Sequence, residues 1–184
     1  MAETSLPSSG FRQARPDDLA AIEALMGAAI RAHFPAFYGH DRIESAVRYI
    51  GKPDPMLIED GTYYVAEDGR GLTACGGWSR RHRLYAGSGG AADDARLLDP
   101  ATEPAPVRAM FVRPDQARRG LGTRIIELCE RAARAEGFTR LTLMATLAGV
   151  PLYERYGFER VEEVDIPLED GTLVEGVRME KAVE

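Results

Sequence analysis

The chain has 184 residues, a length that suits one domain with a core of ordinary size. Hydrophobic residues make up 45% and charged residues 28%, as in a globular protein, and no apolar run approaches the roughly 20 residues of a membrane helix. The formal net charge of −6 argues against nucleic acid as the main partner. Cys75 and Cys129 have no metal-ligand spacing and are interpreted as buried thiols in a reducing compartment. We therefore expect a cytoplasmic protein with no metal, nucleic-acid or membrane partner.

A single domain is the simplest organisation, because the chain has no internal repeat and no clear linker. Residues 1–9 are small and polar and lack the features of a secretory signal, so we expect a flexible N-terminal segment ahead of a domain over residues 10–184. From about residue 82 to 105 the sequence is rich in glycine and proline and has no apolar period. A structureless connection of this length is uncommon in a compact domain, so we expect a long mobile loop there.

Apolar spacing and turn residues predict helices and strands along the rest of the chain. Segments with apolar residues at helical spacing predict helices over residues 16–30, 41–50, 123–136 and 150–156. Segments rich in β-branched and aromatic residues predict strands over residues 11–15, 62–66, 72–78, 107–112, 140–145, 158–164 and 173–179. Because strands and helices alternate in the second half, we expect a mixed sheet packed by helices.

One stretch has the features of an anion site. It reads Val107-Arg-Ala-Met-Phe-Val-Arg-Pro-Asp-Gln-Ala-Arg-Arg-Gly-Leu-Gly-Thr123, a strand and a loop followed by a glycine pair that opens a helix. The first N–H groups of a helix have no internal partners and carry the positive end of the helix dipole. Gly120 and Gly122 would let an anion approach the backbone closely. The pattern predicts a phosphate or pyrophosphate site built from main chain.

Two other phosphate motifs do not fit this stretch. It contains no Gly-Lys-Ser/Thr, which excludes a P-loop. The dinucleotide pattern Gly-x-Gly-x-x-Gly fails because Ile125 stands where the third glycine is needed.

Two segments carry a family resemblance. One is Arg-Arg-Gly-Leu-Gly, which follows a strand ending in Val-x-Pro, and the other is Pro151-Leu-Tyr-Glu-Arg-Tyr-Gly-Phe158. Together they resemble the GNAT superfamily of acyl-CoA-dependent N-acyltransferases. The resemblance covers residues 107–158. It implies an α/β (α+β) fold: a single domain whose central sheet is mixed, mostly antiparallel and flanked by helices, with a coenzyme A cleft between two parallel central strands. It also implies an enzyme, an N-acetyltransferase that moves an acetyl group from acetyl-CoA to an amine by direct attack. The alternative is a non-catalytic acyl-CoA-binding sensor or scaffold.

The resemblance also implies roles for individual residues. Tyr153 stands where the family has a tyrosine that protonates the leaving thiolate, although it could instead be a packed aromatic residue. The residues that would bind the cofactor are Met110, Phe111, Val112, Ala117, Arg118, Arg119, Gly120, Leu121, Gly122, Thr123 and Thr146. Two of them depart from the family: Ala117 stands where Arg or Gln is usual, and Thr146 where Asn is frequent.

The acceptor side has fewer signals. We expect a small-molecule or peptide amine as the acceptor. The sequence leaves open whether the protein forms a homodimer. The strand over residues 107–112 offers no carboxylate, so we expect no base on it, and its Arg108 would disfavour a cationic amine nearby. We expect either deprotonation through water, helped by Glu103 or His82 at the rim, or an acceptor amine of low pKa. Trp78 could equally wall the acceptor pocket or fill the core.

Overall fold

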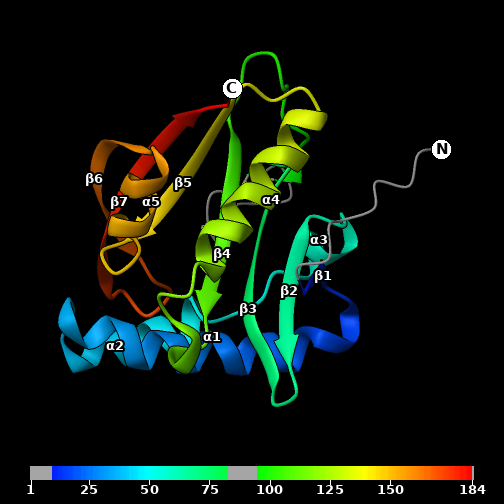
Figure 1. Cartoon of the computed structure of the whole chain (residues 1–184). Helices are drawn as coiled ribbons and strands as arrows, with labels where there is room; N and C mark the ends of the chain where they lie inside the picture. The colour runs from blue at the N-terminus through cyan, green and yellow to red at the C-terminus, as the bar shows by residue number, and fades with distance from the viewer. Residues whose placement is uncertain (1–9, 83–94, 184) are drawn as a thin grey trace.

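The computed structural model describes residues 10–82 and 95–183 (Figure 1). The segment expected to be flexible, residues 1–9, and residues 83–94 of the expected mobile loop lie outside the described residues. The remainder of that loop is anchored: the Leu98 N–H donates to the Arg80 carbonyl, and Leu98 is buried.

A single seven-stranded sheet forms the centre of the molecule, in the order β1-β2-β3-β4-β5-β7-β6. Its strands are β1 (Phe11–Gln13), β2 (Tyr63–Asp68), β3 (Gly71–Trp78), β4 (Ala105–Val112), β5 (Arg140–Thr146), β6 (Glu159–Pro167) and β7 (Leu173–Ala182). All neighbouring strands are antiparallel except β4 and β5, which run parallel. The prediction of a mixed, mostly antiparallel sheet with two parallel central strands is confirmed.

Helices cover both faces of this sheet (Figure 1). They are α1 (Leu19–His33), α2 (His40–Tyr49), α3 (Pro55–Glu59), α4 (Leu121–Ala135) and α5 (Val150–Tyr156), with short 3-10 turns at Pro16–Asp18, Phe34–Ala36 and Pro114–Gln116. The apolar stripe of α4 packs with α5 on one face, and α1 packs on the other. Among the helices described, none is both long and apolar enough to cross a membrane.

All the predicted helices and strands are present, with ends that shift by a few residues. The five-residue helix α3 was not predicted, because it is too short to show an apolar period. Trp78 is 1% exposed and its ring meets that of Phe138 edge-on, with centroids 5.8 Å apart. Trp78 therefore fills the core.

The parallel pair β4 and β5 opens into a wedge. The two strands pair only at their amino ends, where Ala105 lies opposite Leu141 and Pro106 opposite Thr142. Further along, β4 bulges away from regular pairing with β3: two residues, Ala109 and Met110, face one. The carboxyl halves of β4 and β5 are thereby left with space between them.

Candidate active site

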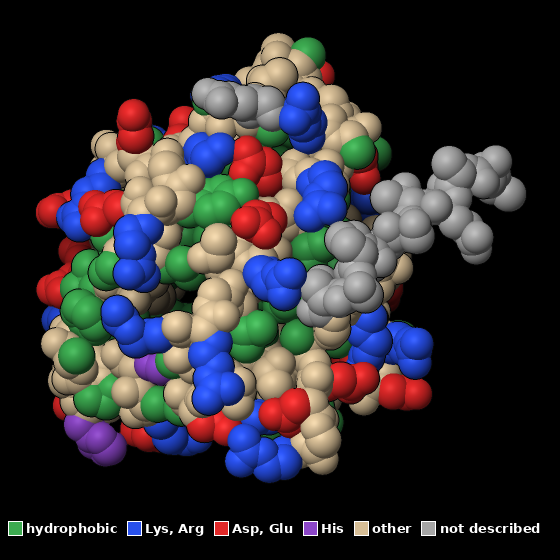
Figure 2. Space-filling model, viewed as in Figure 1, with side chains coloured by type: hydrophobic (Ala, Val, Ile, Leu, Met, Phe, Trp, Pro, Cys, Tyr) green, Lys and Arg blue, Asp and Glu red, His purple; other side chains and the backbone are tan. Residues whose placement is uncertain are grey.

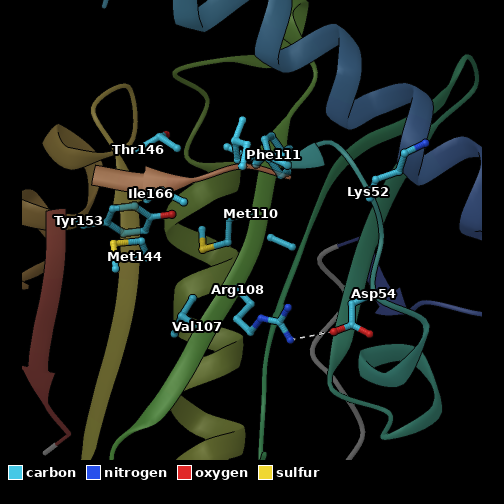
Figure 3. A pocket seen from close by; sticks show the side chains of 13 residues that line it. Lys52, Asp54, Val107, Arg108, Met110, Phe111, Met144, Thr146, Tyr153 and Ile166 are labelled. Carbon is cyan, nitrogen blue, oxygen red and sulfur yellow. Dashed lines mark hydrogen bonds and ion pairs between the residues drawn. The ribbon is translucent and has the colours of Figure 1, made fainter. Parts of the chain in front are cut away.

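A cavity of about 100 Å³ occupies this wedge (Figure 3). It is lined by residues of β4, of β5 and α5, of the connection between α2 and α3, and of the end of β6: Ile50, Lys52, Asp54, Val107, Arg108, Ala109, Met110, Phe111, Met144, Thr146, Tyr153, Ile166 and Leu168. Four residues assigned by the sequence resemblance, Met110, Phe111, Thr146 and Tyr153, thus meet in one cavity. Val112 lies beyond it and pairs with Ala74 of β3.

The Tyr153 side chain projects from α5 into the wedge, and its hydroxyl points toward the space beside Met110 (Figure 3). Gly149 makes room for the ring, because a Cβ there would lie 2.8 Å from Tyr153 Cε2. No described residue forms a hydrogen bond with the hydroxyl. Burial raises the pKa of Tyr153 above its ordinary value, so the phenol keeps its proton at neutral pH. The arrangement presents a protonated donor to the cavity.

The amino end of α4 presents a row of backbone donors. The N–H groups of residues 118–123 have no hydrogen-bond partner among the described residues. The turn that leads into α4 has left-handed backbone at Arg118 (φ +62°) and Gly120 (φ +80°). The Ala117 N–H instead donates to the Pro114 carbonyl over 3.3 Å. Figure 2 shows Lys and Arg side chains gathered around a surface hollow beside this end of the helix. The donors and the positive charge suit an anion.

The two glycines of this turn serve different purposes. Gly120 is exposed, and a Cβ there would meet no atom within 4 Å, so its positive φ is what favours glycine. At Gly122 a Cβ would lie 2.7 Å from a methyl carbon of Leu152. Gly122 therefore lets α5 pack closely against α4, which brings Tyr153 toward the start of α4.

A buried ion pair, which the sequence does not predict, lines the cavity. Arg108 of β4 donates to Asp54 over 2.9 Å, and the two side chains are 3% and 9% exposed (Figure 3). Asp54 also caps α3 by accepting from the Met56 N–H at 3.0 Å. We expected Arg108 to repel a cationic amine, but the Asp54 carboxylate offsets its charge. The sequence signal that could have indicated α3 and its cap is Asp54 followed by Pro55, a cap residue before a proline at the first helical position.

Replacing Asp54 by asparagine should lower the free energy of unfolding by about 2 kcal/mol, the order of a hydrogen bond to a charged group. Asparagine caps a helix as well as aspartate does, so the loss reports the buried charge of Arg108 and not the cap. Urea unfolding measures it. Asp115→Asn is the matched control, because Asp115 pairs with Arg113 at the surface, where its side chain is 43% exposed, and should matter much less. Equal effects in the two variants would contradict the importance of the buried pair.

The two residues expected at the rim do not lie at this cavity. Glu103 forms two hydrogen bonds with Arg96, at 2.6 and 2.9 Å, and this guanidinium lowers the Glu103 pKa to about 2. It precedes the amino end of β4, whereas the cavity lies along residues 107–111. His82 donates its backbone N–H to Arg96 and does not line the cavity. Neither residue lines the cavity, so its lining gives no support to help from either of them, and that expectation stays a prediction.

Comparison with known proteins identifies the family. A sequence profile described as the acetyltransferase (GNAT) domain matches residues 59–160, more than half of the chain. No curated protein sequence matches this chain. A GCN5-related N-acetyltransferase from Rhodopseudomonas palustris is 18% identical, with 94% of each chain covered and a TM-score of 0.71.

Two further solved structures share the fold. The PaiA N-acetyltransferase from Thermoplasma acidophilum, in complex with coenzyme A, is 15% identical, with 94% of this chain and 97% of that chain covered and a TM-score of 0.65. The yncA protein from Salmonella typhimurium, with its cofactor acetyl-CoA, is 15% identical, with 95% and 93% covered and a TM-score of 0.57. With the profile match, the conclusion is that the chain belongs to the GNAT family of acetyltransferase enzymes.

Proposed function

We propose that the protein is an N-acetyltransferase that moves an acetyl group from acetyl-CoA to the amine of a small molecule or peptide, in the cytoplasm. The observation that carries the proposal is the row of backbone donors at residues 118–123 beside a wedge that holds Tyr153. The pyrophosphate would bind the start of α4, and the pantetheine arm would follow β4 along Met110 and Val112. The acetyl group would then reach the cavity between β4 and β5.

The reaction proceeds by direct attack in this proposal. The amine nitrogen adds to the thioester carbonyl carbon, and a backbone N–H of β4 near Met110 stabilises the charge that develops on the carbonyl oxygen. The carbon–sulfur bond then breaks, and the Tyr153 hydroxyl gives its proton to the departing thiolate. The proton lost by the amine passes to water, and Tyr153 regains a proton from solvent.

A covalent cysteine intermediate has no support in this arrangement. Cys75 and Cys129 are fully buried, and neither lines the cavity. Burial raises the Cys75 pKa to about 12 and raises the Cys129 pKa further. The thiolates that such a route needs would be scarce at neutral pH.

The proposal predicts that kcat/KM rises with pH and follows the pKa of the acceptor. An alkylamine with a pKa of about 10.4 is neutral in about one molecule in 2,500 at pH 7, a cost of about 4.6 kcal/mol. Among the described residues, Asp54 is the only carboxylate that lines the cavity, and it is paired with Arg108. The rising limb should therefore shift along a series of amines of decreasing pKa. Because burial raises the pKa of Tyr153, no falling limb from that residue should appear below about pH 10.

A profile fixed at one pH for every amine, and abolished by a single substitution, would reveal a dedicated base and contradict this prediction.

The function itself is tested by thiol release from acetyl-CoA with a panel of small amines, aminoglycosides and peptides. Turnover with at least one class supports the proposal and names the acceptor class. Binding of acetyl-CoA with no thiol release across the panel would favour the non-catalytic sensor or scaffold. Absence of acetyl-CoA binding would overturn both.

A further inference from the structure

The bulge in β4 depends on an unusual backbone conformation. Ala109 has a φ of +52°, a region that alanine rarely adopts. Opposite the bulge stands Gly76, where a Cβ would lie 2.7 Å from Met110 Cγ and 3.2 Å from Met110 Cα. Strained backbone of this kind persists only where the surroundings hold it in place. Gly76 provides the space for the bulge, and a second group must hold the bulge in place.

The hydroxyl of Tyr63 holds the bulge in place. Tyr63 lies on β2, two strands from the bulge, and its hydroxyl donates to the Ala109 carbonyl at 2.6 Å. The ring reaches across Gly77 of β3, where a Cβ would lie 2.7 Å from Tyr63 Cδ2. Tyr63 is 2% exposed, and burial raises its pKa well above the ordinary value, so it stays a proton donor. Gly77 therefore lets the phenol reach the bulge, for which Gly76 makes room.

This hydrogen bond fixes the direction of the next N–H group. All described peptide bonds are trans, and in a trans peptide the C=O of one residue and the N–H of the next point in opposite directions. The Ala109 carbonyl points toward Tyr63, on the β2 side of β4. The Met110 N–H consequently points toward the β5 side, where the wedge opens and where Met110 lines the cavity with Tyr153.

We infer that Tyr63 is a positioning residue, which holds the Ala109–Met110 peptide so that the Met110 N–H is the donor to the thioester carbonyl oxygen. The inference rests on the proposed function, because it concerns the same reaction. Tyr63 contacts no reacting atom and acts only through the bulge. Without its hydroxyl, Ala109 loses the partner that stabilises its positive φ, and the peptide can rotate toward an ordinary strand conformation.

The test is isotope-edited infrared spectroscopy of acetyl-CoA labelled with ¹³C at the thioester carbonyl and bound to the protein. A hydrogen bond lowers the carbonyl stretching frequency, so the bound band should lie higher in Tyr63→Phe than in the wild type. With an acceptor found in the amine panel, kcat should fall at least about tenfold, less than the 10²–10³-fold loss on removing a whole oxyanion donor. The Kd of acetyl-CoA should stay within about threefold, because the pyrophosphate site is untouched.

Two further variants separate positioning from general damage. Tyr64→Phe is the matched control, because Tyr64 is the buried neighbour on the opposite face of the sheet, and it should change neither the band nor kcat. Adding Ala109→Gly to Tyr63→Phe should restore part of both, because glycine adopts positive φ readily. An unchanged band in Tyr63→Phe, or the same loss in Tyr64→Phe, would overturn the inference and leave the proposed function standing. Wild-type protein that binds no acetyl-CoA would overturn both.

Discussion

Replacing Gly120 by aspartate should weaken acetyl-CoA binding by roughly 10²- to 10³-fold, whereas Gly120→Asn should retain most of the affinity. The new carboxylate would stand among the backbone donors of residues 118–123, against the negative pyrophosphate. Two like charges about 4 Å apart repel by about 4 kcal/mol at an effective dielectric constant of 20, and each 1.4 kcal/mol is tenfold in affinity. Residual screening by solvent at this exposed turn sets the lower end of the range.

The asparagine variant makes this test specific. Asparagine and aspartate have the same shape, and both tolerate the left-handed conformation that Gly120 adopts at φ +80°. A Cβ at this position meets no atom within 4 Å, so both variants should fold. Titration calorimetry gives the affinities, and thermal unfolding with ligand gives a second measure, because binding to the native state raises its stability by RT ln(1 + [L]/Kd). Equal affinities in the two variants would place the pyrophosphate elsewhere.

The parts of the site that are local in sequence could be predicted from it. The start of α4 is a continuous segment whose glycines, strand and helix are visible in residues 107–123, and its dipole and free N–H groups follow from helix geometry alone. The Tyr153 helix is likewise a short continuous motif. Both segments keep their meaning without knowledge of what packs around them.

The parts that depend on distant contacts could not be predicted. Tyr63 and Ala109 are 46 residues apart, and Asp54 and Arg108 are 54 apart, so neither pair leaves a periodic signal. The bulge that directs Met110 arises from sheet register, which a run of apolar residues does not encode. Glu103 is close to β4 in sequence but does not line the cavity, because the wedge opens toward the carboxyl end of the strand.

Tyr153→Phe should lower kcat by roughly 10²-fold while the Kd of acetyl-CoA changes little. The substitution keeps the ring, which packs edge-on against Phe158 with centroids 5.8 Å apart, and removes only the hydroxyl that points into the cavity. General acid catalysis contributes about 10²- to 10⁴-fold, and water can replace part of it in the variant. Steady-state kinetics with the best acceptor of the panel measures kcat, and calorimetry measures Kd.

Tyr156→Phe is the matched control for this prediction. Tyr156 lies on the same helix, but its hydroxyl donates to Glu130 at 2.6 Å and does not line the cavity, so kcat should be nearly unchanged. The comparison separates the two interpretations of Tyr153. A packed aromatic residue would tolerate phenylalanine without loss, whereas a proton donor to the thiolate would not. A Tyr153→Phe enzyme with the wild-type kcat would show that the thiolate leaves without help from this phenol, and that Tyr153 serves only to pack α5 against the sheet.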